Sequence, residues 1–180
     1  MRKVVLAPLL AAAVAAPAQA EVKSATPIGF EIEAKTVVRA TPAETYDALT
    51  RIGEWWDSEH TYSGDASNMT LKPEAGGCFC EAIPADGGTI EHARVVYARP
   101  GQTLRLQGGL GPLQSEAVVG TLTWQLKPVA AGTELTQTYV VGGFVRGGAD
   151  KLAPIVDQVM GHQLARLTEH LVDQRTQSGD

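Results

Sequence analysis

Apolar and polar residues alternate along residues 30–40, where Phe30, Ile32 and Ala34 are separated by charged residues. This period of two predicts a strand with one buried face. Six further short stretches of strand type follow, each bounded by Gly or Pro, and paired glycines between them fit tight hairpins. The sequence therefore predicts an antiparallel meander. The six stretches are 68–72, 78–83, 89–99, 103–107, 120–128 and 133–141.

Other segments have the period of a helix. Thr41, Pro42 and Glu44 have the spacing of a capping box, which predicts a short helix to about residue 50, and a second short helical segment is expected at 54–56. After the strands, apolar residues recur every three or four positions over 152–171. This long amphipathic helix needs a large apolar partner, and a curved sheet is the only candidate in the chain.

The first twenty residues have the order of a secretory signal peptide. Basic residues precede an apolar run, and an Ala-Gln-Ala triplet ends at Ala20. We expect cleavage after Ala20, a periplasmic or secreted location, a loose lead-in over 21–29 and one domain over 30–176. The apolar run is shorter than the ~20 residues that cross a bilayer, so no membrane span is expected.

Charge and cysteine content exclude several classes of protein. The chain has 15 Lys and Arg against 20 Asp and Glu, a net charge of −5. An acidic chain without a basic cluster is a poor nucleic-acid binder, because phosphate neutralisation supplies most of that affinity. Two cysteines cannot build a disulfide-dense scaffold. The chain has no P-loop, dinucleotide fingerprint or Ser-His-Asp order, so no cofactor is expected.

The motif Cys78-Phe79-Cys80 is the most unusual feature of the chain. Residues two apart on a strand share a face, so both thiols would lie side by side, and a bond between them would need a bulge. One interpretation is a metal or redox site with His60 or His92 as a third ligand. The motif lacks the paired spacing of a zinc site, so simple packing or a disulfide is favoured and no metal is expected.

The order of elements resembles the START-like (SRPBCC) helix-grip superfamily, and more closely its polyketide-cyclase-like and activator-of-Hsp90-ATPase-homologue-like branch. Three motifs carry the resemblance: TPAETYDAL at 41–49, GGCF at 76–79 and GTELT at 132–136. The resemblance implies an α+β fold in which a curved antiparallel sheet of six to seven strands wraps around the C-terminal helix. Two short helices follow the first strand. A secretion signal is not typical of Hsp90-linked members, so that role is not expected.

The resemblance also implies a deep apolar cavity between the sheet and the helix. Trp124 and Tyr139 on two strands would line its concave wall, and the helix would contribute three further residues. Trp55, Trp56 and Tyr62 fall where the resemblance places the cavity rim; for the two indoles a structural role is favoured, with ligand gating as the alternative. The helix residues are Val159, Met160 and Gln163.

Candidates for acid–base chemistry are His60, His92 and Tyr97. His92 and Arg94 would share one face of their strand. If that face points inward, the pair could orient an acidic or carbonyl-bearing ligand. The apolar pattern is nearly balanced between the faces and slightly favours an outward, solvated pair.

Three functions are compatible with these features. The favoured one is a non-catalytic module that holds an apolar or amphipathic small molecule in the cavity. The second is a cyclase- or dehydratase-like enzyme, which would require clustered His, Tyr and Glu side chains in the cavity. The third is a protein-interaction module, which a cavity filled by side chains would favour.

Overall fold

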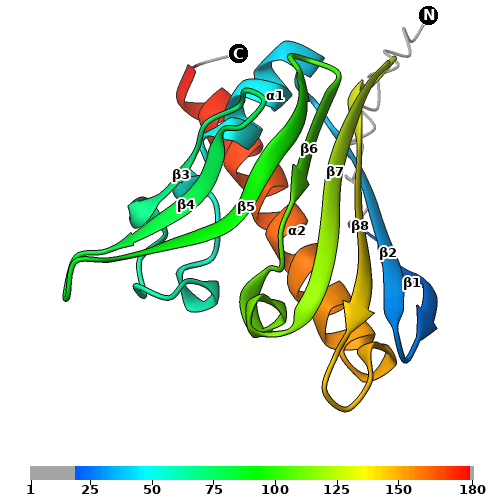
Figure 1. Ribbon diagram of the computed structural model, residues 1–180. Coiled ribbons are helices and arrows are strands. Elements are labelled where there is room, and N and C mark those ends of the chain that lie inside the picture. The colour runs from blue at the N-terminus through cyan, green and yellow to red at the C-terminus, as the bar shows by residue number, and fades with distance from the viewer. Residues whose placement is uncertain (1–18, 179–180) are drawn as a thin grey trace, which may run out of the picture.

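The computed structural model describes residues 19–178 and confirms the α+β fold: an open, curved antiparallel sheet with one long C-terminal helix (Figure 1). Eight strands follow one another in the order β1-β2-β8-β7-β6-β5-β4-β3 across the sheet. The strands are β1 (Gln19–Thr26), β2 (Gly29–Val38), β3 (Met69–Leu71), β4 (Cys78–Ile83), β5 (Gly88–Arg99), β6 (Thr103–Gln107), β7 (Ala117–Val129) and β8 (Gly132–Phe144).

The two α-helices begin and end close to the predicted positions. In α1 (Pro42–Thr50), Thr41 accepts a hydrogen bond from the Glu44 N–H, and the Glu44 carboxylate accepts one from the Thr41 N–H, so the predicted capping box is present. The long helix is α2 (Ala153–Ser178). The 3₁₀ turns are η1 (Ile52–Glu54), η2 (Ser58–His60), η3 (Ala66–Asn68), η4 (Gly111–Ser115) and η5 (Ala149–Lys151).

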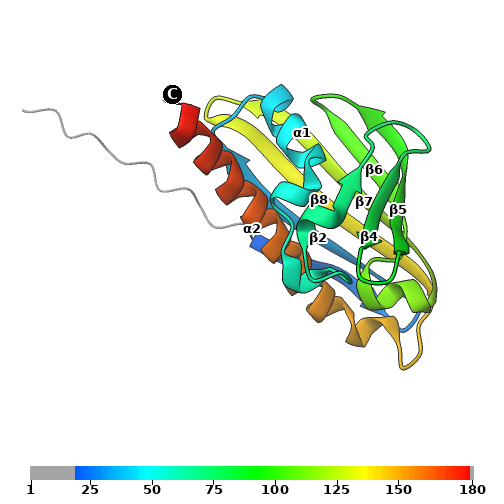
Figure 2. The ribbon, with the colours of Figure 1, turned by 90° about the vertical axis from the view of Figure 1, so that its left-hand side faces the viewer.

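The long helix α2 runs across the concave face of the sheet, and α1 lies beside it on the same side of the sheet (Figure 2). The C-terminal part of the predicted apolar stripe is the buried face of this helix, formed by Met160, Leu164, Leu167 and Leu171, whereas Ile155 near its start is 59% exposed. These side chains and the inward residues of the strands form one continuous core. No helix within residues 19–178 has the length and apolar character that crossing a membrane requires.

The segment 21–29 is not a loose lead-in. Most of it belongs to β1, an edge strand that pairs antiparallel with β2, for example through Val22 and Ile32. The pairing of this strand with β2 shifts register between Val22 and Ser24, and the residues after Val22 show no regular apolar alternation that would reveal a strand. This strand raises the number in the sheet from the seven predicted to eight.

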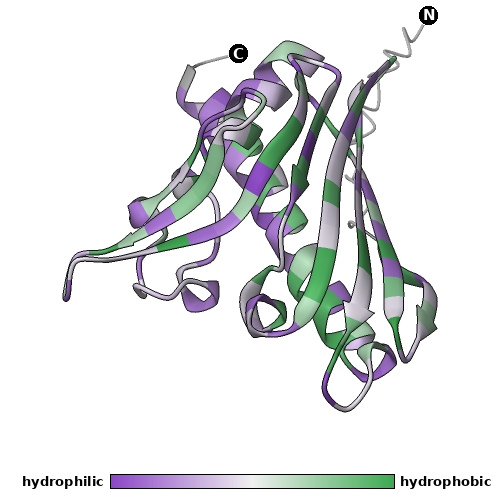
Figure 3. Cartoon of the chain, in the orientation of Figure 1, coloured by the Kyte–Doolittle hydropathy of each residue, from purple (hydrophilic) through white to green (hydrophobic). Residues whose placement is uncertain are grey.

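Strands β2, β8 and β7 form the regular half of the sheet. Their pairing runs without a bulge through the full length of both interfaces, and hydrophobic and hydrophilic residues alternate visibly along β2 (Figure 3). Ile32, Tyr139 and Leu122 lie opposite one another across this half, and all three are buried. A Cβ on Gly120 would lie 2.3 Å from the Tyr139 hydroxyl, so the glycine makes room for the tyrosine.

Strands β3 to β6 form the irregular half. Pairing between β4 and β5 skips His92, because Phe79 lies opposite Ala93 whereas Cys80 lies opposite Glu91. Pairing between β5 and β6 likewise skips Val96. Each bulge adds one residue to β5 and changes which side chains point inward. The face of a residue on β5 therefore does not follow from simple alternation.

Candidate functional site

Side chains occupy the space between the sheet and α2. Trp124 and Tyr139, predicted to line a cavity, are fully buried and bonded within the protein. The Trp124 indole donates to the Gln137 side-chain oxygen at 2.8 Å, and the Gln137 amide donates to the Met160 carbonyl at 2.9 Å. Three hollows of about 610, 680 and 400 Å³ lie elsewhere, around the start of α1 and beside η1.

The two adjacent indoles are both buried. Trp55 donates to the Leu49 carbonyl and Trp56 donates to the His60 carbonyl, at 3.3 and 3.2 Å. Their rings lie 5.5 Å apart, and the Trp56 ring meets the Phe79 ring edge-on at 5.6 Å. Both indoles therefore help to build the core below the loop that carries η1 and η2.

Gln163 and His60 fasten this loop to α2. The Gln163 side-chain oxygen accepts from the Asp57 N–H at 2.9 Å, and its amide nitrogen lies 3.2 Å from His60 Nδ1. Asp57 also pairs with His162 at 2.9 Å. Of the remaining helix residues predicted for the cavity wall, Met160 is buried and Val159 half-buried.

A buried pair of titratable side chains, Glu81 on β4 and His92 on β5, lies beside the Phe79 ring and the chain segment that follows η2. His92 Nε2 is 2.9 Å from a Glu81 oxygen, and the two residues are 5% and 1% exposed. The Glu81 carboxylate also accepts hydrogen bonds from the backbone N–H groups of Tyr62 and Ser63. These two backbone groups are donors, which suits an ionised acid because a carboxylate only accepts hydrogen bonds.

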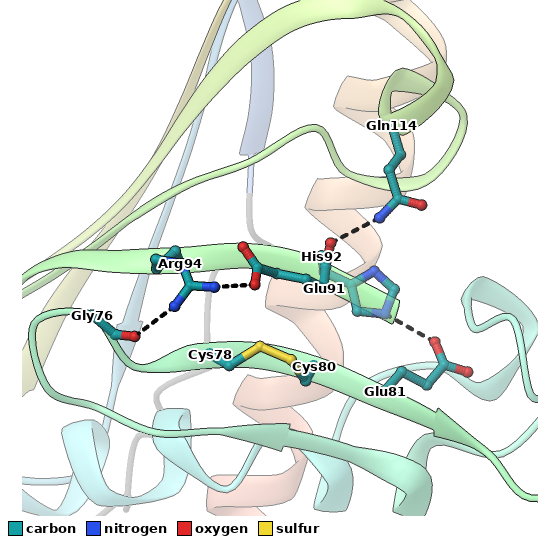
Figure 4. The surroundings of a disulfide bond; sticks show 8 residues. All are labelled: Gly76, Cys78, Cys80, Glu81, Glu91, His92, Arg94 and Gln114. Atoms are coloured by element: carbon teal, nitrogen blue, oxygen red, sulfur yellow. Dashed lines mark hydrogen bonds and ion pairs between the residues drawn. A yellow bond between two sulfur atoms is a disulfide. The ribbon is translucent and has the colours of Figure 1, made fainter. Parts of the chain in front are cut away.

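The expectation that His92 points outward beside Arg94 is wrong. His92 is the extra residue of the β5 bulge. The bulge allows two consecutive residues, His92 and Ala93, to be buried, which regular alternation would not permit. Arg94 stays on the outer face, where it pairs with Glu91 and donates to the Gly76 carbonyl (Figure 4). The bulge separates two residues that regular alternation would place together.

Burial and hydrogen bonding set the charges of the pair. Burial acts to raise the pKa of Glu81, but the hydrogen bonds from Ser63, Tyr62 and His92 outweigh it and hold that pKa below its ordinary value. Burial lowers the pKa of His92, and the pull of the Glu81 carboxylate only partly opposes this. Near neutral pH the acid is therefore ionised and the imidazole neutral.

A neutral imidazole beside a carboxylate must place its proton on the nitrogen that faces the carboxylate, which here is Nε2 of His92. The other ring nitrogen, Nδ1, is then a hydrogen-bond acceptor and a base. Figure 4 shows this nitrogen on the side of the ring away from Glu81. It has no hydrogen-bond partner among the side chains and backbone of the described residues.

Aromatic side chains surround the imidazole. The Phe79 ring lies 4.9 Å from the His92 ring on one side, and the Tyr62 ring lies 5.9 Å from it. Tyr62 is 51% exposed, and its hydroxyl donates to the Gly111 carbonyl in η4 at 3.2 Å. A Cβ on Gly108 would lie 2.2 Å from the His92 carbonyl oxygen, which shows how closely the β6–η4 connection approaches the bulge. Tyr62 and η4 thus cover the His92 end of the interior.

Cys78 and Cys80 are joined by a disulfide on the outer face of β4 (Figure 4). Both are half-exposed, whereas Phe79 between them is buried. The register shift between Phe79 and Cys80 is the irregularity that such a bond was expected to need. Among residues 19–178, no three His, Cys, Asp or Glu side chains form a group that could hold a metal ion.

The structure brings together only some of the predicted site residues. His92 and Tyr62 meet, but His60 belongs to the contacts of the η2 loop with α2. Tyr97 lies 43% exposed, with the Arg105 guanidinium 5.8 Å from its ring centre. Glu81 was missed altogether. The signal for it was a charged residue two positions after the apolar Phe79, in the inward register of a strand.

Solved structures with a similar fold are known, although comparison with protein-family models and curated sequences finds no match. An uncharacterized protein from Rhizobium leguminosarum superposes with a TM-score of 0.60 at 18% identity, over 88% of this chain and 99% of that one. A Mesorhizobium loti protein gives 0.58 at 20% identity, over 80% and 97%.

A third neighbour has a described role. The di-domain ARO/CYC StfQ of the steffimycin biosynthetic pathway superposes with a TM-score of 0.55 at 15% identity. The match covers 83% of this chain and 52% of StfQ. These likenesses are consistent with a helix-grip, cyclase-like fold, which is an architecture that could bind ligands.

Proposed function

We propose that the protein binds a small, partly apolar molecule with an aromatic or enolic hydroxyl, which donates its proton to Nδ1 of His92. The observation that carries the proposal is the buried Glu81–His92 pair, which leaves one imidazole nitrogen as an unused acceptor. The rings of Phe79 and Tyr62 favour an aromatic body for the ligand. A few well-placed polar groups within apolar walls are typical of ligand sites.

The ligand site is proposed at the His92 end of the interior rather than along the whole sheet–helix interface. Trp124 and Tyr139 fill that interface and satisfy their own hydrogen bonds. At the His92 end the cover is Tyr62, a half-exposed side chain held through its hydroxyl. We expect that displacement of this ring, which the Tyr62 hydroxyl links to η4, gives a ligand access to the imidazole.

Binding of 1-naphthol and of 1-methoxynaphthalene, measured by titration calorimetry, tests the proposal. The two probes share an aromatic body, and only naphthol can donate to His92. One hydrogen bond of about 1.4 kcal/mol makes naphthol bind about tenfold more tightly. His92→Phe should abolish this difference, because phenylalanine keeps a ring at this position but has no hydrogen-bond acceptor, and His60→Phe is the matched control that should preserve it. Equal affinity of the two probes for the native protein would refute the proposal.

A second candidate function, acid–base catalysis, is favoured by the same pair. A carboxylate that fixes the tautomer of a histidine and stabilises its imidazolium is a recurring catalytic arrangement. In this mechanism Nδ1 of His92 takes a proton from the carbon next to a carbonyl, and Glu81 stabilises the positive charge that results. StfQ, an ARO/CYC, has the same overall fold, which supports this candidate only by analogy.

Proton exchange of 2-tetralone in D₂O, followed by NMR, tests the catalytic candidate. Catalysis predicts that the native protein accelerates deuterium incorporation and that Glu81→Gln and His92→Gln each reduce the rate by about 10²-fold or more, the usual range for an acid–base group. Exchange at the buffer rate in the presence of native protein would exclude catalysis on this class of ketone and leave the binding function.

We also propose that the protein acts outside the cytoplasm. The signal-like order of residues 1–20, which lie mainly outside the described part of the chain, supports this location. The Cys78–Cys80 disulfide supports it as well, because such bonds persist in oxidising compartments. Cleavage after Ala20 would leave Glu21–Thr26 of β1 paired with β2. N-terminal sequencing of the native protein should begin at Glu21; an intact Met1 terminus would contradict this.

A further inference from the structure

The Cys78–Cys80 disulfide lies directly across from the bulge that turns His92 inward. Phe79 pairs with Ala93 and Cys80 pairs with Glu91, so His92 has no partner on β4. It lies opposite the step from Phe79 to Cys80, which is within the stretch that the disulfide closes. The crosslink is on the outer face and His92 on the inner face of the same two strands. We propose that this disulfide is a positioning element that holds His92 on Glu81, and that its reduction releases the histidine.

The crosslink shortens β4 at this point. The Cα atoms of Cys78 and Cys80 are 5.4 Å apart, whereas two residues of a regular strand advance about 6.4–6.8 Å. Along this shortened stretch, β4 advances two residues from Cys78 to Cys80 while β5 advances three, from Arg94 to Glu91. The extra residue in β5 is the local irregularity that accompanies it, and bulges of this kind redirect side chains.

Both β4 residues that contact the imidazole lie within one position of a bonded cysteine. Phe79, between the cysteines, is fully buried with its ring 4.9 Å from the His92 ring. Glu81, directly after Cys80, holds the other side of the imidazole through its carboxylate. The small covalent ring that includes the Phe79 backbone therefore restricts the two contacts that orient His92.

Reduction needs a dithiol, which can approach Cys78 and Cys80 from solvent because both residues are partly exposed on the outer face of β4. One dithiol thiolate attacks a sulfur, the S–S bond breaks, and the second dithiol group completes the exchange. The protein gains two electrons and two protons as a pair of thiols, and the dithiol becomes a cyclic disulfide. β4 can then extend and its pairing with β5 can become regular. A one-residue change of register moves a side chain to the opposite face, so His92 leaves Glu81.

The orientation of His92 is measured directly by long-range ¹H–¹⁵N NMR of ¹⁵N-labelled protein, with and without dithiothreitol. In the oxidised protein, we expect one protonated and one unprotonated ring nitrogen. In the reduced protein, we expect averaged tautomers and an upward shift of the His92 pKa toward its ordinary value. Cysteine Cβ chemical shifts report whether the bond is broken. Cys78→Ser/Cys80→Ser should match the reduced protein without any reductant.

Arg94→Gln is the matched control, because Arg94 lies opposite Cys78 on the same outer face but leaves the disulfide intact. It should retain the oxidised His92 spectrum. An unchanged His92 spectrum after complete reduction would overturn the proposal. Global unfolding of both the reduced protein and the double serine variant, seen by circular dichroism, would also overturn it, because the bond would then hold the fold rather than the histidine.

The effect of this release on ligand binding rests on the proposed function. If that function is correct, reduction should abolish the tenfold higher affinity for 1-naphthol over 1-methoxynaphthalene. The NMR measurement involves no ligand, so the two ideas fail separately. A His92 spectrum that responds to reduction in a protein that binds neither naphthalene probe would support the positioning role and reject the ligand.

Discussion

The two halves of the sheet are built differently. Strands β2, β8 and β7 pair without interruption and contribute buried side chains such as Leu135 and Leu122 to the core. Strands β4 and β5 carry a bulge, a disulfide and the buried Glu81–His92 pair within a few residues of one another. Regular pairing maximises apolar packing, whereas the bulge places one polar ring in a position that regular pairing forbids. Stability and chemistry are thereby assigned to different strands.

The largest expected effect breaks the regular half. Leu135→Ala removes a fully buried side chain of β8 and leaves a cavity, so the free energy of unfolding should fall by about 2–5 kcal/mol. Urea denaturation measures this loss. Val140→Ala, on the exposed face of the same strand, should stay within about 0.5 kcal/mol of the native protein. In the folded fraction, the His92 NMR spectrum should be unchanged, and a shifted spectrum would show that the halves are not independent.

A smaller effect on stability, but a decisive one on the site, is expected from Glu81→Gln. The amide can still accept from the backbone of Ser63, but its NH₂ group must donate to His92. The His92 proton therefore moves to Nδ1, and the acceptor proposed for the ligand disappears. We expect about 1–3 kcal/mol lower stability, since a hydrogen bond to a charged group is lost. Glu91→Gln, on the exposed face, is the control, with less than about 1 kcal/mol.

Acidification should affect the irregular half first. The pKa of His92 is lowered by folding, so its contribution to stability is complete above the ordinary value near 6.5 and is lost as the pH falls toward the folded value. The pKa of Glu81 is also lowered, so its contribution is lost at still lower pH, below its ordinary value of 4.5.

The loss of stability from each group is at most about 1.4 kcal/mol per pH unit, the value for one proton. Urea denaturation of native protein and of His92→Gln between pH 7 and 4 measures it. The variant should lack the part of the loss that begins near pH 6.5. Identical pH profiles would contradict the buried, neutral state of His92.

The sequence reveals these halves unequally. Alternation of apolar and polar residues and the capping box at Thr41 were sufficient for β2, α1, α2 and the meander, because each depends on local pattern. The edge strand β1 was missed because its register shift removes the pattern. The inward turn of His92 was missed because a bulge depends on pairing with β4, which no local period encodes.

The candidate site was therefore only half predictable. His92 and Tyr62 were recognised as chemistry-bearing residues, but their meeting depends on a contact between segments 30 positions apart. Glu81 was overlooked because charged residues are almost always exposed, and its burial is explained only by three donors from β5 and the Tyr62 loop. Which donors will meet this carboxylate depends on the folded arrangement of separate segments and cannot be predicted from the local sequence.

The smallest expected effect concerns the cover over His92. Tyr62→Phe removes the hydroxyl that donates to Gly111, while the ring remains over the imidazole. Because Tyr62 is half-exposed, stability should change by less than about 1 kcal/mol. The uncovered state becomes more populated, so 1-naphthol should associate about two- to fivefold faster, as measured by stopped-flow fluorescence. Tyr97→Phe removes an equally exposed hydroxyl from the outer face and should leave the rate unchanged. An equal increase in both variants would mean that Tyr62 does not control access to the site.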